Sequence, residues 1–492
     1  METLLANLGL AGQFSLSGVA HPIKTHSRFE IEALSSATVD ALTLVLRRLQ
    51  GNTDPSQPTS AATKRLALAF WMSDRLFLVN KKRPEVWDPL SGDYSLGSRE
   101  YIRLHCNFKA HRAAAVGAVL GAEVDPVSPE RSVMAKALAE ASMNPNELVA
   151  RVEARGGCAA IMRSMTQWHE HPLYQLLKDS PVLSVLKMPT NVDCATCTTP
   201  SPFIASKDDP ALPLKGLKVL DLTRVLAGPV CTNLLAGLGA QVIHVSDSTL
   251  EGLPFVDLVT GVGKRSCHLN LKSAKGKGKL LELIREANVF VQAYRPGSLA
   301  ALGLDHVTLH TLNPSLTYVN ISAYNLPFCT QPPVKPNPYH NRRGFDSLVQ
   351  METGIAHEGG DGARPVPLPC QALDHATGWL ATIGVVHALA KGGGCLVETS
   401  LARTSVWLDT MGRKEGSEIV GEERMWREEL LNDLEGNIGI MEDVVVRGER
   451  GDVLTRVRMP LYLEGYGHAF STDGSALLGP PEKLGMDKPA WA

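Results

Sequence analysis

Leu214-Lys-Gly-Leu-Lys-Val-Leu-Asp221-Leu-Thr-Arg224-Val-Leu-Ala-Gly228-Pro229 is the stretch of this sequence that decides the fold. Its apolar half predicts a buried strand, and the Gly-Pro pair predicts a tight turn. A helix over residues 230–238 and a second strand over residues 241–245 would complete a β-α-β unit. Short β-branched strands then alternate with amphipathic helices to about residue 410, which indicates an α/β fold with a mostly parallel sheet.

A second stretch carries the candidate chemistry. Gln371-Ala-Leu-Asp374-His-Ala-Thr-Gly378 sets one acidic residue in a turn of small residues ahead of an apolar helix, Trp379 to Ala390. A carboxylate at a helix N-terminus lies in the field of unpaired backbone N–H groups, which would keep it ionised and offer donors to an oxyanion beside it. The same pattern is typical of an ordinary N-cap, so this segment alone does not separate a nucleophile from a capping residue.

Length and composition exclude several classes of protein. At 492 residues the chain is long enough for two or three domains, and its net charge of −2 gives no global field for nucleic acid or an anionic membrane. No apolar run reaches the length of a membrane span, and the N-terminus lacks the basic region of a secretory signal. Nine scattered cysteines suit reduced thiols better than a disulfide framework. We therefore expect a cytoplasmic protein without a metal site.

Three regions follow from the distribution of residues. Residues 1–205 are helix-rich in their second part and end in a proline-rich stretch that is typical of a linker. Residues 206–410 form the α/β region. Residues 411–492 are a charge-rich tail, for which we predict a helix near residues 422–434 and strands beginning at Asp443 and Val453, returning to the core.

The α/β region contains seven short motifs whose order along the chain can be compared with that of known families. The first is the opening stretch, and the others are Gly263-Lys-Arg-Ser266 with Leu269-Asn-Leu-Lys272, Ala293-Tyr-Arg-Pro-Gly297, Leu302-Gly-Leu304, Leu312 to Val319, Gly344-Phe-Asp346-Ser-Leu-Val-Gln350 and the Asp374 segment. Together they resemble the family III CoA-transferases, which include formyl-CoA transferase, carnitine CoA-transferase and α-methylacyl-CoA racemase. The resemblance implies a Rossmann-like core and makes Asp374 the catalytic residue.

The resemblance also implies a coenzyme A site. CoA would be a substrate rather than a tightly bound cofactor, and its phosphates call for cations while its adenine calls for an apolar slot. The matching positions are Arg224, Leu226, Ala227, Leu269, Lys272, Ala293, Tyr294, Arg295 and Arg343. Two positions depart from the family, because Asp247 and Ala301 stand where basic residues are usual. The phosphate site is therefore expected to be rearranged.

Two further positions bear on the reaction. Asp346 falls where formyl-CoA transferase has an acidic residue beside the nucleophile, and we expect it to orient a substrate or to tune Asp374. Phe345 stands where the racemases have a histidine that acts as acid and base. Since phenylalanine carries no proton, this residue favours CoA transfer between an acyl-CoA and a small carboxylic acid over racemisation. A racemase-type or lyase-like relative and a non-catalytic acyl-CoA-binding homologue remain the alternatives.

The N-terminal half resembles parts of the same family in an unusual order. The segments Arg99 to His105, His111 to Ala115, Glu147 to Gly157 and Met162 to Pro172 look like pieces that family members carry after their nucleotide-binding domain, and here they come before it. This order implies a fused or partly duplicated architecture whose first copy has no segment matching Asp374. The family forms interlocked dimers, so we expect a homodimer.

Overall fold

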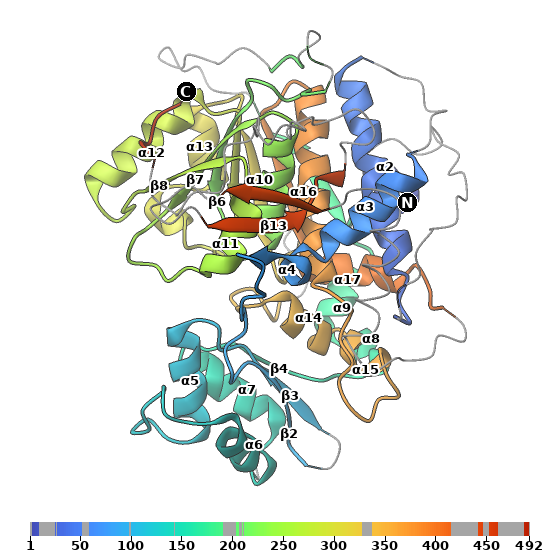
Figure 1. Cartoon of the computed structure of the whole chain (residues 1–492), viewed down its shortest axis with the longest axis vertical. Helices are drawn as coiled ribbons and strands as arrows, with labels where there is room; N and C mark the ends of the chain where they lie inside the picture. The colour runs from blue at the N-terminus through green and yellow to red at the C-terminus, as the bar shows by residue number, and fades with distance from the viewer. Residues whose placement is uncertain are drawn as a thin grey trace.

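The computed structural model describes most of the chain, with gaps. The described residues are 2–8, 25, 27–51, 59–97, 100–141, 143–189, 203–205, 209, 211–326, 337–414, 441–445, 452–460 and 487–491. The helix expected near residues 422–434 lies outside them. Figure 1 shows a large α/β body with a smaller unit below it.

The body is built on a seven-stranded sheet with the order β5-β11-β10-β9-β6-β7-β8. Six strands run parallel, and β5 pairs antiparallel with β11 at one edge. The strands are β5 (Leu183–Lys187), β6 (Lys218–Leu222), β7 (Gln241–Ser246), β8 (Lys264–His268), β9 (Val289–Gln292), β10 (Thr317–Ser322) and β11 (Cys395–Ser400). Counted from β6, the parallel strands follow the order 3-2-1-4-5-6 of a doubly wound Rossmann fold. The α/β prediction is confirmed.

Alternate residues of each strand face opposite layers of helices. Val219 and Val319 pack with α10 (Ala227–Gly237) and α16 (Ala372–Ala390), whereas Leu220 and Tyr318 pack with α12 (Ala274–Glu286) and α13 (His306–Leu312). The remaining elements of this part are α11 (Pro254–Gly261), the 3-10 turn Ala300–Leu302, α14 (Asp346–Glu352), α15 (Ile355–Glu358) and α17 (Leu401–Asp409).

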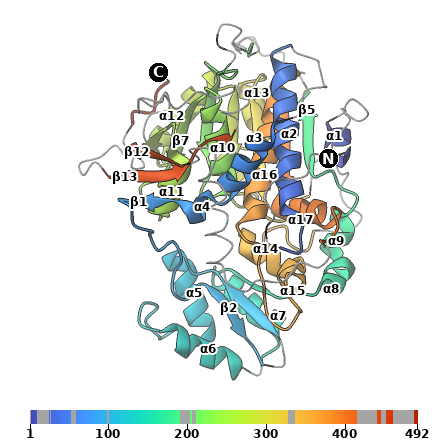
Figure 2. The ribbon, with the colours of Figure 1, turned by 45° about the vertical axis from the view of Figure 1, so that its right-hand side comes forward.

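Helices from the N-terminal half cover the outer side of α16. The long helix α2 (Ile31–Leu49) runs along α16, followed by α3 (Ala61–Trp71) and the short α4 (Ser73–Leu76), as Figure 2 shows. Because α16 lies between the sheet, α10 and α2, it is buried along almost its whole length, which explains why it is apolar on every side. The first helix is α1 (Glu2–Asn7).

The smaller unit spans roughly residues 83–163 and has its own apolar core. Its three-stranded antiparallel sheet is ordered β2-β3-β4 and is covered by three helices. These elements are β2 (Gly92–Ser95), β3 (Tyr101–Leu104), β4 (Ala159–Ile161), α5 (Lys109–Val119), α6 (Arg131–Ala139) and α7 (Pro145–Ala154). The face formed by Cys158 and Ala160 packs on Leu348 and Met351 of α14, so the unit is joined to the body beside that helix. The chain returns through α8 (Met165–Glu170) and α9 (Pro172–Leu177).

A third sheet joins the two ends of the chain. β13 (Val453–Val457) pairs antiparallel with both β1 (Leu78–Val79) and β12 (Met441–Val445). The tail therefore contains the two expected strands. The division of the chain at residues 205 and 410 stays a prediction, but β5 and β1 show that pairing crosses both boundaries.

Two helices begin earlier than the sequence predicted. α10 starts at Ala227 rather than at residue 230, and α16 starts at Ala372 rather than at Trp379. Pro229 fits inside the first turn of α10 because the N–H that proline lacks has no intrahelical partner there. In the described residues, no helix is both long and apolar enough to cross a membrane.

Candidate active site

The candidate residues converge at the carboxyl ends of the parallel strands. Arg224 follows β6, and Tyr294 and Arg295 follow β9, so they flank the point where the strand order reverses. In doubly wound sheets this switch point is where ligands bind. The N-terminus of α16 lies at the same edge, because a helix that leads into a parallel strand runs antiparallel to it.

Asp374 lies in the first turn of α16, and Asp346 begins α14 beside it. The backbone N–H of Asp374 donates to Asp346 Oδ2 at 2.8 Å, and Gln350 Nε2 donates to Asp346 Oδ1. Asp346 is 1% exposed and Asp374 is 9% exposed, so both carboxylates are buried and Asp374 keeps the larger exposed fraction. The structure therefore brings the two predicted carboxylates together.

The structure excludes the N-cap alternative for Asp374, since Gln371 is the N-cap residue and Asp374 comes three positions later. The helix N-terminus does not lower the pKa of Asp374 as expected: burial raises that pKa well above its usual range, and Asp346 and Asp74 raise it further. The N–H of Asp374 is also unavailable to an oxyanion, because it is bonded to Asp346.

The pKa of Asp346 is also raised by burial, but hydrogen bonds oppose this increase. Burial raises the pKa of Asp346 to about 6, while hydrogen bonds from Gln350 and from the backbone N–H groups of Asp374 and Leu373 hold it down. These donors favour the ionised form of Asp346.

A third carboxylate comes from the N-terminal half. Asp74 of α4 lies with its Oδ1 3.5 Å from Nε2 of His375, the residue after Asp374. The His375 ring is fully buried and stacks on Trp71 of α3 with a centroid distance of 6.3 Å. His375 therefore points away from the substrate side and toward α3 and α4. Sequence reasoning missed Asp74, because no local pattern connects α4 to a residue 300 positions later.

A glycine sets the close approach between α16 and the residues after β6. A Cβ on Gly378 would lie 2.6 Å from the carbonyl oxygen of Ala227 and 2.8 Å from Val230 Cγ1. Only glycine allows the first turns of α16 and α10 to approach this closely. This contact places Asp374 next to the segment Leu226–Ala227, which the sequence assigned to CoA.

The same segment holds an unusual backbone conformation. Val225 has a φ of +69°, in the left-handed region that β-branched residues rarely adopt. Such outliers persist where the surrounding structure fixes them, and they concentrate at ligand sites. Val225 lies between Arg224 and Leu226, so the strain falls within the candidate CoA segment.

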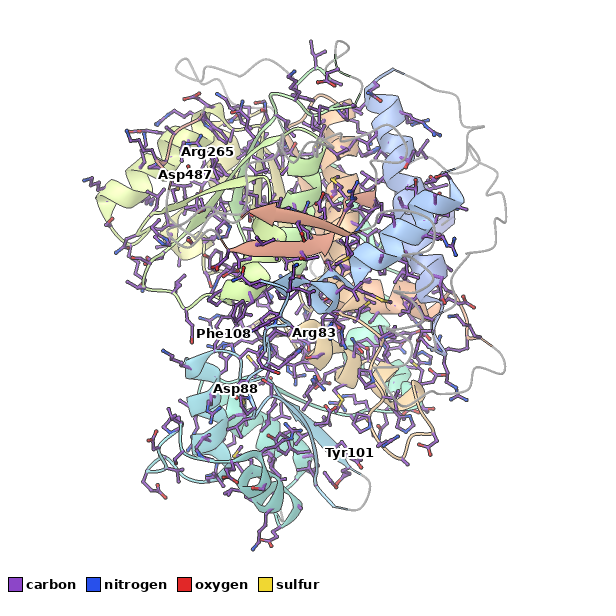
Figure 3. All side chains as sticks on the ribbon, viewed as in Figure 1. Arg83, Asp88, Tyr101, Phe108, Arg265 and Asp487 are labelled. Atoms are coloured by element: carbon purple, nitrogen blue, oxygen red, sulfur yellow. The ribbon has the colours of Figure 1, made fainter. Side chains whose placement is uncertain are left out.

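Three of the predicted cations form what we call the arginine cluster, which consists of Arg224, Arg295 and Arg343. Arg224 and Arg343 are half-buried, and Arg295 is exposed. All three lower the pKa of one histidine, His111 of α5, to about 4, with burial as the larger cause. Phe108, at the start of α5, lies 5.0 Å beneath the Arg224 guanidinium, and Figure 3 places it at the junction between the smaller unit and the body.

The remaining CoA candidates lie farther along the same edge. Lys272 is exposed after β8, and its charge lowers the pKa of Asp247 after β7, although the hydrogen bonds from Thr249 lower it more. Tyr294 is half-buried. Burial raises the pKa of Tyr294, although the charge of Arg224 partly offsets this increase. The apolar candidates Leu226, Ala227 and Leu269 are buried, and Ala293 is half-buried. The predicted residues thus follow one edge of the sheet, from Lys272 to Arg343.

The comparison with protein families agrees with this arrangement. Residues 214–422 match the model of CoA-transferase family III. An acyl-CoA transferase of Fusarium pseudograminearum is 32% identical over 222 residues, which is 40% of this chain and 47% of the relative. Human succinyl-CoA:glutarate CoA-transferase is 33% identical over 214 residues, covering 39% of this chain and 46% of the relative.

A bacterial CoA-transferase is also similar to this region. The formyl-CoA:oxalate CoA-transferase of Escherichia coli O139:H28 is 34% identical over 190 residues, covering 36% of this chain and 44% of the relative. The chain spans less than half the length of each of these relatives. Residues 214–422, which carry Arg224, Asp346 and Asp374, are thus the part of this chain that is similar to CoA-transferase family III.

Proposed function

We propose that this protein transfers CoA between an acyl-CoA and a carboxylic acid, with Asp374 as the covalent nucleophile. The observation that supports the proposal is the position of Asp374: it is the more exposed residue of a buried carboxylate pair, at the sheet edge that also carries the arginine cluster. The relatives named for glutarate and oxalate make dicarboxylic acids the first acceptors to test.

The reaction proceeds in steps that conserve atoms and charge. A carboxylate oxygen of Asp374 attacks the thioester carbonyl, the C–S bond breaks, and the CoA thiolate leaves with an acyl-aspartyl anhydride on the enzyme. The thiolate then attacks the aspartyl carbonyl and releases the first acid. The incoming carboxylate attacks the aspartyl-CoA thioester, and the freed thiolate attacks the new acyl carbonyl, which yields the new acyl-CoA and regenerates Asp374.

Asp346 acts by adjusting Asp374 rather than by attacking substrate. Burial raises the pKa of Asp374, and the charge of Asp346 raises it further. A carboxylate with a raised pKa is a stronger nucleophile once it is deprotonated. Asp346 is therefore a positioning residue that also accepts the N–H of Asp374.

A direct assay tests the proposal. The full chain is incubated with succinyl-CoA or formyl-CoA and a panel of carboxylates, and acyl-CoA species are followed by mass. We expect a new acyl-CoA with at least one acceptor and a hydroxylamine-sensitive adduct on the peptide that contains Asp374. Asp374→Asn is the control that should show neither. CoA binding without turnover by the wild-type protein would instead support a non-catalytic acyl-CoA-binding homologue.

A homodimer is proposed as well, on the family resemblance alone. Sedimentation of the full chain at several concentrations would test it.

A further inference from the structure

The smaller unit presents one edge of α5 to the arginine cluster. His111 lies in the first turn of α5, with its ring centroid 5.2 Å from that of Phe108 and 5.8 Å from that of Phe345. Phe345 directly precedes Asp346, and Phe108 lies beneath Arg224. His111 is thus located between a residue adjoining the carboxylate pair and a residue adjoining the arginine cluster.

Aromatic stacking holds this contact in place. His105 is 3% exposed and stacks face to face on Phe345, with centroids 3.7 Å apart and planes inclined by 2°. Arg343 lies against the backbone at Gly156, where a Cβ would be 3.6 Å from Arg343 Nη2. The N-terminal half therefore meets the site through fixed contacts on both sides of His111.

The arginine cluster lacks a carboxylate partner within the described residues. Arg224 donates to the backbone oxygen of Glu251, and no salt bridge to Arg224, Arg295 or Arg343 occurs in the part of the chain that the structure describes. Guanidinium groups that converge without a described counter-ion suit an anionic ligand, because charge-assisted hydrogen bonds to such a ligand are strong.

Within the described residues, His111 has few hydrogen-bond partners. Its one described hydrogen-bond contact is Cys158, whose Sγ lies 3.7 Å from Nδ1. Burial raises the pKa of the Cys158 thiol to about 12, so Cys158 stays a thiol and offers only a weak interaction. A neutral imidazole with weak contacts, surrounded by guanidinium groups, is well suited to bind a ligand that brings negative charge.

We propose that His111 contacts the anionic ligand held by the arginine cluster, so that α5 supplies the second wall of the ligand site. The identification of this ligand as a CoA thioester rests on the proposed function. The contact itself rests on the geometry of α5. On this reading the segment that precedes the sheet in sequence completes the site, and the α/β region alone is only half of it.

Proton uptake provides a sensitive readout of this contact. Burial and three arginines lower the pKa of His111 to about 4 in the free protein, and a bound anion would raise it toward the usual value of about 6.5 or above. Between those values the bound state holds more protons than the free state, so binding takes up a proton. The charged and titratable groups that face His111 are Arg224, Arg295, Arg343, Cys158 and His105.

The experiment compares full-length variants in binding CoA. Calorimetric titrations at about pH 6, in buffers of different ionisation enthalpy, give both the dissociation constant and the number of protons taken up. His111→Phe keeps the ring and removes the nitrogens, and His111→Gln keeps a hydrogen-bonding group that cannot titrate. His169→Gln is the matched control, because His169 of α8 pairs with Asp409 instead of the arginine cluster. Pyrophosphate is the second probe.

The expected result is specific to each variant. His111→Phe should weaken CoA binding about tenfold or more, as for a lost hydrogen bond to a charged group. His111→Gln should lose the additional proton uptake that the wild-type protein shows, with a smaller loss of affinity. Since CoA phosphates also exchange protons, the difference between wild type and His111→Gln is the measured quantity. The control should match the wild type in both readouts.

The measurements distinguish a failure of the His111 inference from a failure of the proposed CoA-transfer function. Equal affinity and equal proton uptake in wild type and both His111 variants would overturn the inference while leaving CoA transfer intact. A wild-type protein that binds CoA with His111-dependent proton uptake but transfers no CoA would overturn the proposed function alone. A wild-type protein that binds neither CoA nor pyrophosphate would overturn the inference as well.

Discussion

Arg342 and Arg343 are adjacent in sequence but belong to opposite kinds of site. Arg342 Nη1 lies 2.7 Å from Glu352 Oε1, and its Nε lies 2.6 Å from Glu153 of α7. Glu352 also accepts from Arg163 at 2.8 Å and from the Tyr339 hydroxyl at 2.9 Å. We call this the paired network. Arg343 belongs to the arginine cluster, where the described residues supply no carboxylate.

The paired network stabilises the contact between the smaller unit and the body, whereas the arginine cluster is proposed to be available for ligand binding. Burial alone would raise the pKa of Glu352, but Arg342 and Arg163 outweigh burial and lower it, so Glu352 is ionised and its charges are balanced. The network joins α7 and the segment after β4 to the body, and it lines a cavity of about 520 Å³. Balanced charges here fix the smaller unit, whereas Arg343, one residue later, has no described carboxylate partner and is proposed to face an anionic ligand. Charge balance therefore predicts which substitutions harm stability and which harm function.

Asp374→Asn should show the largest functional effect. An amide cannot form the acyl anhydride, so CoA transfer should fall by about a thousandfold or more. Stability should be unchanged or higher, because the substitution removes a buried acid that interacts unfavourably with Asp346. Turnover and thermal unfolding of the same preparation would check both parts. Retention of more than about a tenth of wild-type turnover would contradict the assignment.

Glu352→Gln should reduce the stability of the fold. It leaves Arg342 and Arg163 without their shared carboxylate in a buried site, which we expect to destabilise the fold by about 3 kcal/mol or more. Arg343→Gln is the matched control, since it removes a charge that has no described carboxylate partner and should leave unfolding nearly unchanged. Denaturant unfolding of the two variants would decide the matter. Equal losses of stability would abolish the distinction between paired network and arginine cluster.

Gly378→Ala tests packing at the site without changing charge. The added methyl would meet the Ala227 carbonyl at 2.6 Å, and the displacement should cost about 1–3 kcal/mol and move Asp374 away from the Leu226–Ala227 segment. Gly278→Ala in α12 is the control: a Cβ there meets nothing within 4 Å, so the protein should gain about 0.5–1 kcal/mol. Thermal unfolding and kcat/KM would be measured together. A gain of stability at both positions would show that the helices can separate freely.

Asp346→Asn should produce the smallest change, a shift in pH dependence. Transfer by the wild-type protein should rise with pH as the carboxylate pair loses its proton. Removing the charge of Asp346 lowers the pKa of Asp374, so this rise should move to lower pH. A kcat/KM profile of both proteins would show the shift. A rise at unchanged or higher pH would mean that Asp346 does not control the ionisation of Asp374.

The sequence predicted the α/β region well because its signals are local. The strand at residues 218–222 and the strand at residues 241–246 are short, apolar and bounded by turn residues, and the helix between them could be inferred from its neighbours. The start of α16 was missed because Ala372 to Gly378 are small and polar residues typical of turns. Tertiary packing against Ala227 and α2 makes that segment helical.

The long-range contacts of the site could not be predicted. Asp74 and His111 lie far in sequence from Asp374 and Arg343. His111 opens a family-like segment, but no pattern in the sequence assigned a chemical role to either residue. The Asp346–Asp374 contact was anticipated only through the family resemblance. Their pKa values depend on burial, which a sequence does not contain, so the raised pKa of Asp374 could not be predicted.

The position of α2 has a consequence for synthesis of the chain. Its apolar face, including Leu34, Leu42 and Leu46, is fully buried in the finished protein, and the helix that covers it starts about 320 residues later. At ribosomal rates of about 5–20 residues per second, α2 emerges tens of seconds before α16 does. An apolar helix without its partner for that long is a target for chaperones and for aggregation. Survival of the nascent chain, rather than the stability of the finished fold, would then limit how much of this protein a cell obtains.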